Sequence, residues 1–186
     1  MKNMRESVER ISYLMTHPVF KECIEKNRLA EVNRSFCHHD IEHLLTVSRM
    51  MYIKVLELEL PFEKSLVYAT GLLHDLGRFM EYEKKASHDE AGALLAERIL
   101  PECGFDEEEC HLIAGAIGCH RGDRDNILMG EAVCVKNEIP KHTEPVDLLS
   151  NILYLCDKSS RNCSFCPAKE ECKWSEEKKR MHLNVI

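Results

Sequence analysis

The sequence lacks the features of a membrane, fibrous or disordered protein. No run approaches the roughly 20 consecutive apolar residues that a membrane-spanning helix needs. Glycine and proline are scarce, with 8 and 6 among 186 residues, which excludes a collagen-like or low-complexity chain. Hydrophobic residues make up 44% of the chain and are spread along its whole length. We therefore expect one ordered, globular domain with an ordinary core.

Positive charge is also in short supply. The 25 Lys and Arg residues are outnumbered by 32 Asp and Glu residues, which gives a formal net charge of -7. A nucleic-acid polymer usually binds to a basic face, so we do not expect one as a partner. Small anionic substrates stay compatible, because a bound metal reverses the local field. The charged N-terminal residues lack a signal-peptide pattern, so we expect a cytoplasmic protein without a membrane partner.

The contents of cysteine and histidine are unusually high, with ten residues of each. Ten cysteines in a small secreted protein would suggest disulfides, but this chain is long enough to bury an ordinary core. We expect reduced thiols. Several of them are expected to be small buried apolar residues, namely Cys23, Cys103, Cys110 and Cys134.

Apolar residues recur at spacings of three and four along nearly the whole chain, which predicts helices. Two shorter helices are expected before position 36, and a charged final helix from Trp174. Ser87 is a predicted N-cap with Glu90 completing a capping box, and Asp106 is a second N-cap. The main predicted helices cover residues 39–60, 61–73, 87–100, 106–120 and 144–157.

Strand signals are poor. Only residues 132–135 are a candidate for extended structure, within a polar and irregular stretch at 121–141 that predicts a functional loop or a disordered one. We therefore predict an all-α helical bundle in a single domain. Its expected parts are N-terminal helices at 1–35, a core at 36–161, and a Cys-rich segment with a final helix at 162–186.

Several His and Asp residues lie on the apolar faces of separate predicted helices. A buried carboxylate or imidazole costs on the order of several kcal/mol unless it is paired. One such residue is usually a hydrogen-bonded core residue, but a whole set is better explained by metal ions that neutralise it. The set consists of His43, His74, Asp75, His88, His120 and Asp157.

These residues carry a resemblance to a known family. His43, the segment Leu72–Gly77 with its His-Asp pair, and Asp157 resemble the H…HD…D signature of the HD superfamily of metal-dependent phosphohydrolases. His88 and His120 resemble the two further histidines of its dinuclear branch. That branch includes dinucleoside tetraphosphate hydrolases and HD-GYP cyclic-dinucleotide phosphodiesterases. The GYP tripeptide is absent after His120, which disfavours cleavage of cyclic dinucleotides.

The resemblance implies a ligand set. One ion would be held by His43, His74, Asp75 and Asp157, and a second by His88 and His120, with Asp75 bridging both. Nitrogen and oxygen ligands of this kind suit Fe, Mn, Co, Ni or Zn. His39 and His43 are four residues apart and are an alternative ligand pair. We favour His43 as the ligand, with His39 or Asp40 contacting the ligands or the substrate.

The expected activity follows from this centre at His74 and Asp75. Two close cations activate a water, which attacks phosphorus in a nucleotide or another small phosphate ester. Arg78, Lys158 and Arg161 are candidate phosphate contacts, although a solvated surface charge explains each equally well. The alternatives are a diiron oxygenase on the same fold and a non-catalytic metal- or redox-sensing module. A homodimer is compatible with each of these functions.

A second cluster follows Asp157. Cys163, Cys166 and Cys172 have the spacing of metal-binding thiolates, with Zn or an Fe–S cluster as the expected occupant. This segment resembles a Cys-rich tail in a clostridial-type group of HD proteins. A fourth ligand would come from Cys37, Cys156 or His182. The alternative is a set of reduced thiols packed under Trp174, or a redox-labile pair.

Overall fold

The computed structural model describes residues 4–119, 143–176, 178 and 179. Within these residues the chain forms helices and turns but no strand, which confirms the predicted all-α fold. None of the described helices is long and apolar enough to cross a bilayer. The elements are α1 (Met4–Thr16), α2 (Pro18–Ala30), α3 (Ile41–Glu57), α4 (Lys64–Leu73), α5 (Arg78–Tyr82), α6 (His88–Ile99), η1 (Pro101–Cys103), α7 (Glu107–Gly118), α8 (Pro145–Ser159) and η4 (Cys163–Phe165).

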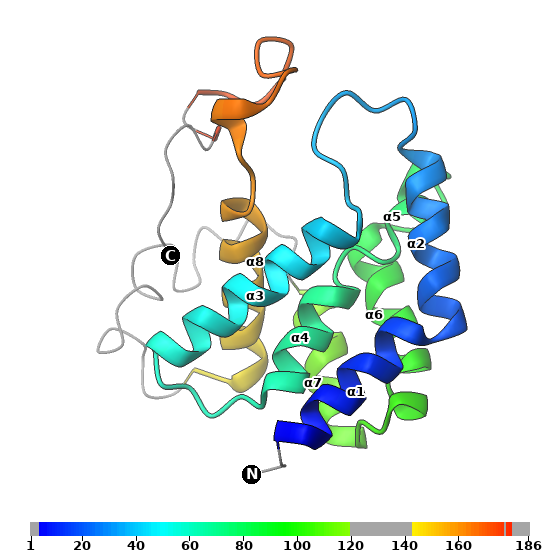
Figure 1. The fold of residues 1–186 in the computed structure, drawn as a ribbon, viewed down its shortest axis with the longest axis vertical. Coiled ribbons are helices and arrows are strands. Elements are labelled where there is room, and N and C mark those ends of the chain that lie inside the picture. The colour runs from blue at the N-terminus through cyan, green and yellow to red at the C-terminus, as the bar shows by residue number, and fades with distance from the viewer. Residues whose placement is uncertain (1–3, 120–142, 177, 180–186) are drawn as a thin grey trace.

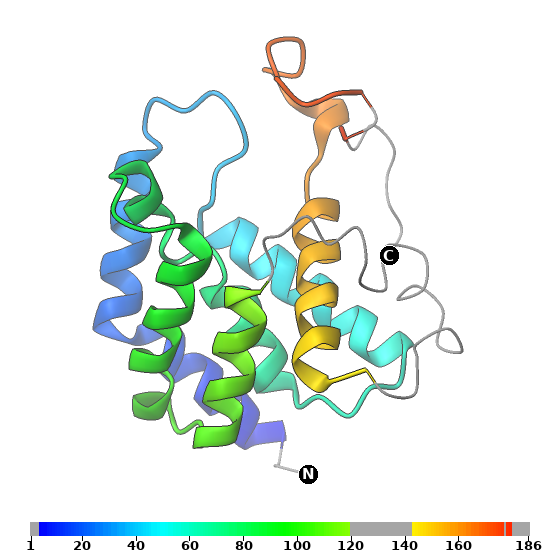
Figure 2. The same ribbon diagram turned by 180° about the vertical axis from the view of Figure 1, so that it is seen from behind.

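Helix α4 lies at the centre of the bundle, where it contacts α1, α3, α6, α7 and α8 (Figures 1 and 2). Eight of its ten residues are buried, as expected of a helix that is enclosed by others. Leu72 and Leu73 are fully buried in the same hydrophobic core as Ile113 of α7 and Leu149 of α8. The C-terminal end of α4 is therefore enclosed by the surrounding helices.

The two predicted N-terminal helices are confirmed as α1 and α2. A buried arginine on α1 ties this part of the chain to the core. The Arg10 guanidinium donates to Ser65 Oγ at 3.0 Å and to Glu109, and its carbon lies 3.7 Å from the centre of the Phe105 ring. Arg10 thereby links α1 to α4 and α7.

The two predicted N-caps are formed in different ways. Asp106 caps α7 in a full capping box, because its carboxylate accepts from Glu109 N at 2.9 Å and Glu109 accepts from Asp106 N at 3.0 Å. Ser87 is the N-cap residue of α6, but its hydroxyl donates to the Glu90 carboxylate at 2.8 Å. The predicted capping box at Ser87 is therefore wrong, because the two side chains bond to each other and not to the backbone.

Helix α3 is shorter than the predicted helix over 39–60. Asp40 is its N-cap and accepts from His43 N at 3.0 Å, so His39 precedes the helix. The helix ends before Glu59, whose φ of 51° lies in the left-handed region. The following helix starts at Lys64 and not at Pro61.

Other differences concern short or charged segments. Helix α5 was not predicted, because five residues are too few to show a period. The predicted final helix from Trp174 is absent from the described residues 174–176, 178 and 179, where Lys178 N and Lys179 N both donate to Ser175 O in a turn. The predicted loop at 121–141 and the extended segment at 132–135 lie outside the described residues.

Candidate metal centre

The adjacent His74 and Asp75 occupy a tight turn at the end of α4. His74 is fully buried, and its Nδ1 lies 2.7 Å from Gly71 O, so this nitrogen donates to the carbonyl and Nε2 faces the interior. The turn packs directly on α6. A Cβ atom at Gly92 would lie 2.9 Å from His74 O, so only glycine permits this approach. Local packing therefore fixes the orientation of the His74 ring.

Four side chains from three regions of the chain converge at this turn. The Nε2 atom of His43 lies 3.6 Å from both Asp75 Oδ2 and Asp157 Oδ1. His74 Nε2 lies 3.3 Å from Asp75 Oδ2 and 4.0 Å from Asp157 Oδ1. Across the described residues, these four form a group whose ligand atoms all lie within 4.8 Å of one another. We refer to His43, His74, Asp75 and Asp157 as the quartet.

The two oxygens of Asp75 face different partners. Oδ2 faces His43 and His74, whereas Oδ1 lies 3.5 Å from His88 Nε2 and 3.8 Å from Arg78 Nη1. His88 is the first residue of α6 and is buried. The Asp75 carboxylate therefore has side-chain nitrogen atoms on both of its sides.

Neighbouring groups lower the pKa values of the two carboxyl groups of the quartet. Burial raises the pKa of Asp75, but the adjacent His74 and the contact with His43 outweigh it and hold the pKa well below its ordinary value of 3.8. Burial likewise raises the pKa of Asp157, and Lys158 and His74 outweigh it and lower the pKa. Both carboxyl groups are therefore anionic at neutral pH.

The quartet fits a metal ion by an independent criterion. His43 Nε2 and Asp75 Oδ1 are buried polar atoms that make no hydrogen bond to another described residue. A buried polar atom without a hydrogen bond costs roughly 1–3 kcal/mol. Imidazole nitrogens and carboxylate oxygens are the ligands that Fe, Mn, Co, Ni and Zn take in proteins. A cation bound by the quartet would satisfy His43 Nε2, so the residues present fit a metal centre.

His88 is oriented by neighbours that the sequence pattern did not indicate. Its Nδ1 contacts the Glu81 carboxylate of α5 and lies 2.7 Å from Arg78 Nη1. Burial lowers the pKa of His88, and the positive charge of Arg78 lowers it further. A neutral imidazole whose Nδ1 donates to Glu81 presents a lone pair on Nε2 toward Asp75.

The buried carboxylate of Glu31, the C-cap residue of α2, orients His39. Glu31 accepts hydrogen bonds from His39 N at 2.7 Å, from His39 Nδ1 at 2.5 Å and from the Tyr82 hydroxyl at 2.5 Å. The ring of His39 stands edge-on to that of His43, with centres 5.6 Å apart, and His39 Nε2 lies 3.8 Å from Asp75 Oδ2. His39 therefore lies beside the quartet, although it is not on the same helix as His43.

Asn27 of α2 holds the backbone of the turn. Its amide nitrogen donates to Asp75 O at 3.0 Å, and its amide oxygen accepts from Phe79 N at 2.8 Å. The side chain is almost completely buried. Asn27 thereby ties both ends of the segment that follows His74 to α2.

The structure places the predicted phosphate contacts at different distances from the quartet. Arg78 lies beside Asp75, as described above. Lys158 Nζ donates to Asp157 Oδ2 at 2.5 Å and so neutralises a ligand. Arg161 lies farther along the chain, where its Nε donates to Lys158 O at 3.0 Å and its guanidinium stacks 4.3 Å from the centre of the Trp174 ring. Binding of phosphate by these three residues stays a prediction.

Other predicted residues have simpler outcomes. His120 and Cys134 lie outside the described residues. Cys23, Cys103 and Cys110 are buried as predicted, and burial raises the pKa of Cys23 and of Cys103 to about 11.

Sequence reasoning missed four residues at the centre: Asn27, Glu31, Glu81 and Tyr82. Asn27 and Glu31 lie on or just after a helix with a charged surface, where a polar residue gives no periodic signal. Glu31 is eight residues from His39, so only the turn after α2 brings the two together. The consecutive histidines His38 and His39 were the signal in the sequence that pointed to this part of the centre.

Comparisons with known proteins agree with this architecture. A protein of uncharacterised function from Clostridium beijerinckii is 27% identical over 176 residues, which cover 95% of this chain and 99% of that protein. Ribonuclease Y from Clostridium tetani is 26% identical over 124 residues, but these make up 66% of this chain and only 22% of the ribonuclease. This chain therefore spans about a fifth of the length of that enzyme.

A solved structure is similar in fold. It is the crystal structure of a predicted HD superfamily hydrolase from an uncultured Thermotogales bacterium, with a TM-score of 0.55 and 22% sequence identity. The match covers 91% of this chain and 87% of the other. Finally, the family model of the HD domain matches residues 40–162, a region that contains the whole quartet and His88. The chain belongs to the HD domain family.

Proposed function

We propose that this protein is a metal-dependent phosphohydrolase that acts on a nucleotide or another small phosphate ester at a dinuclear centre. The observation that carries the proposal is the position of Asp75, whose two oxygens face separate nitrogen donors. His43, His74 and Asp157 complete the ligand set for one ion, and His88 begins the set for a second. The predicted second donor, His120, is two residues beyond the end of α7 in the sequence.

The chain supplies orientation and charge around this centre. Metal ions held by these residues would lower the pKa of a water molecule and would offset charge on phosphoryl oxygens. Gly71 O and Glu81 fix the rings of His74 and His88 with Nε2 inward. Arg78 has its guanidinium beside Asp75 Oδ1 with 18% of its side chain exposed, so it is available to a phosphate group that approaches from outside.

The similarity to a named enzyme and the net charge of the chain limit the range of candidate substrates. Ribonuclease Y is by its name an enzyme that acts on RNA, which supports cleavage of a phosphorus–oxygen bond by this chain. The net charge of -7 favours a small phosphate ester over a polyanion, because a polymer needs an extended basic surface.

The test is a substrate panel with protein purified without oxygen or chelator. We expect metal-dependent release of phosphate or of a nucleotide from a member of a panel of mononucleotides, dinucleoside polyphosphates, cyclic nucleotides and sugar phosphates. Replacement of His74 by Ala or of Asp75 by Asn should lower the turnover at least ~10²-fold, because each removes a ligand. Asp147→Asn, in the first turn of α8, is the matched control and should retain activity.

Three outcomes would contradict the proposal. The first is inactivity of the folded, metal-loaded protein on the whole panel. The second is turnover of RNA in preference to every small ester. The third is consumption of oxygen with an organic substrate, which would instead indicate the diiron oxygenase chemistry considered above.

A further inference from the structure

Three cysteines after α8 lie at successive corners of one turn structure. Cys166 N donates to Cys163 O at 3.2 Å, Lys169 N to Cys166 O at 3.3 Å, and Cys172 N to Lys169 O at 3.4 Å. Each bond closes a turn of four residues, so the chain coils back on itself between Cys163 and Cys172. This short segment thereby concentrates three thiols in a small volume.

The exposure of these thiols separates them from the structural cysteines of the core. Cys23, Cys103 and Cys110 are almost completely buried, as small apolar residues are. Cys163, Cys166 and Cys172 are only partly buried, and the adjacent Phe165 is 83% exposed. The segment therefore has little hydrophobic packing to stabilise it, and the thiols do not serve as core residues.

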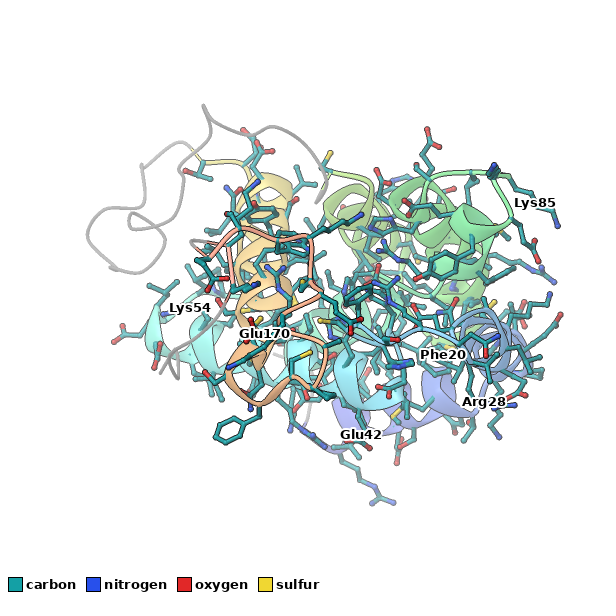
Figure 3. The ribbon with its side chains drawn as sticks, turned by 90° about the horizontal axis from the view of Figure 1, so that it is seen from above. Phe20, Arg28, Glu42, Lys54, Lys85 and Glu170 are labelled. Carbon is teal, nitrogen blue, oxygen red and sulfur yellow. The ribbon has the colours of Figure 1, made fainter. Side chains whose placement is uncertain are left out.

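A fourth thiol comes from the loop between α2 and α3. This loop and the Cys-rich segment project from the same end of the molecule (Figures 1 and 2), and Figure 3 shows the segment with Glu170 from that end. Burial raises the pKa of the Cys37 thiol, and the neighbouring Cys163 and Cys166 raise it further while Arg161 lowers it. Cys37 thus lies within electrostatic range of both cysteines of the CxxC pair.

The other described candidate for a fourth ligand is less suitable. Cys156 is 1% exposed and lies on α8 in the hydrophobic core, one residue before Asp157. His182 lies outside the described residues. Among the described residues, Cys37 therefore completes the set best.

We propose that Cys37, Cys163, Cys166 and Cys172 bind a metal centre that is separate from the quartet. Four thiolates bind Zn²⁺ or an iron–sulfur cluster, and the C-x₂-C spacing is common to both. Two cations offset the negative charge of such a centre. The charge of Arg161 lowers the pKa of Cys37. The hydrogen bond to Glu176 raises the pKa of Lys179, and Cys172 adds a smaller electrostatic contribution in the same direction.

The centre would fasten the C-terminal segment to the loop that carries His39. In the structure no three of these four sulfur atoms lie within 4.8 Å of one another, unlike the ligand atoms of the quartet. Binding therefore draws the loop at 31–40 and the segment at 160–176 together. Since Cys37 is two residues from His39, this closure also restrains the edge of the quartet.

Elemental analysis tests the proposal. Protein carrying His74→Ala, purified without oxygen or chelator, isolates the thiolate centre from the quartet. We expect about one zinc per chain, or iron with acid-labile sulfide and a brown colour, which distinguishes the two occupants. Adding Cys37→Ser or Cys166→Ser should remove that metal. Cys119→Ser is the control and should retain it, because Cys119 is an exposed thiol outside the set.

Thiol labelling of the unmodified protein gives a second readout that does not depend on the folding of any variant. An alkylating reagent with mass-spectrometric mapping should modify Cys119 at once and the four ligands only after a chelator or acid removes the metal. Cys23 and Cys103 should react only on unfolding. Unchanged reactivity of the four thiols on chelation, or a Cys163–Cys166 disulfide without metal, would overturn the proposal.

Discussion

At the scale of single residues, Asn27 shows how one buried amide shapes the metal centre. Its two hydrogen bonds pair the carbonyl of Asp75 and the amide of Phe79. In Asn27→Ala both backbone groups lose their partner inside the protein, and each costs roughly 1–3 kcal/mol. We expect the free energy of unfolding to fall by about 2–4 kcal/mol in urea denaturation.

The matched control for this substitution is Asn33→Ala, since Asn33 is exposed. It should change the free energy of unfolding by less than about 0.5 kcal/mol. Equal stability of the two variants would show that the amide of Asn27 does not hold the turn.

Glu31 gives the protein a defined sensitivity to acid. Burial alone would raise the pKa of Glu31, but hydrogen bonds from His39 and Tyr82 outweigh it and lower the pKa from 4.5 to about 2. Above pH 4.5 the carboxylate is charged in both states, and its hydrogen bonds stabilise the folded state. As the pH falls from 4.5 to 2, the unfolded state binds the proton first, and a contribution of about 2–3 kcal/mol is lost.

The measurement is the free energy of unfolding by urea at several pH values across that window. Glu31→Gln cannot titrate, so its stability should fall less steeply with decreasing pH than that of the unmodified protein. Parallel pH profiles for the two proteins would contradict the role of the Glu31 carboxylate in this window.

At the scale of elements, Gly71 of α4 allows a close approach to α3. A Cβ atom at Gly71 would lie 2.7 Å from Ser48 Cα and 2.9 Å from Ser48 N, which are backbone atoms that cannot rotate away. Gly71→Ala must therefore separate the helices that carry His43 and His74. We expect a loss of about 1–3 kcal/mol of stability and at least about tenfold weaker metal binding, measured by urea denaturation and calorimetric titration.

Gly118→Ala separates this effect from the general effect of alanine in a helix. A Cβ atom there would lie 3.6 Å from Ala93 Cβ, an ordinary contact, so this variant should be as stable as the unmodified protein or more so. Tolerance of Gly71→Ala would show that the spacing of α3 and α4 is adjustable.

The sequence predicted elements better than it predicted their ends. Long apolar periods at α3, α4, α7 and α8 predicted these helices correctly, since burial of one face dominates their stability. The start of α3 was misplaced because Asp40 competes with the apolar pattern by capping the helix. The side-chain bond between Ser87 and Glu90 has the same sequence signature as a capping box, and sequence cannot distinguish the two.

The sequence likewise predicted some residues of the candidate centre and missed others. The residues His43, His74, Asp75 and Asp157 were predicted because each lies on or at the end of an apolar helix and matches the motif. Asn27 and Glu31 were not, since each reaches the centre through tertiary contacts of α2. Both precede residue 40, where the match to the HD domain begins, so the family pattern carries no signal for them.

At the scale of the whole molecule, metal binding should stabilise the folded state against heat. A ligand at 100 times its dissociation constant adds about 2.7 kcal/mol, which for a chain of this size raises Tm by roughly 5–10 °C. Treatment with a chelator should lower Tm by a similar amount in differential scanning calorimetry.

Two variants separate the contribution of the quartet to this change in Tm from that of the thiolate centre. In His74→Ala the part of the shift due to the quartet should disappear, and in Cys166→Ser the part due to the thiolate centre. A Tm that is insensitive to chelator in metal-loaded protein would contradict both assignments.

The quartet joins α3 and α4 to Asp157 near the end of α8, more than 80 residues beyond Asp75 in the sequence. During synthesis, the first three ligands leave the ribosome well before the fourth. Until α8 emerges, the nascent chain therefore holds three ligands without the carboxylate that completes them. An ion that requires all four ligands would therefore bind only after α8 has emerged, and a translation product that ends before Asp157 would lack the complete set.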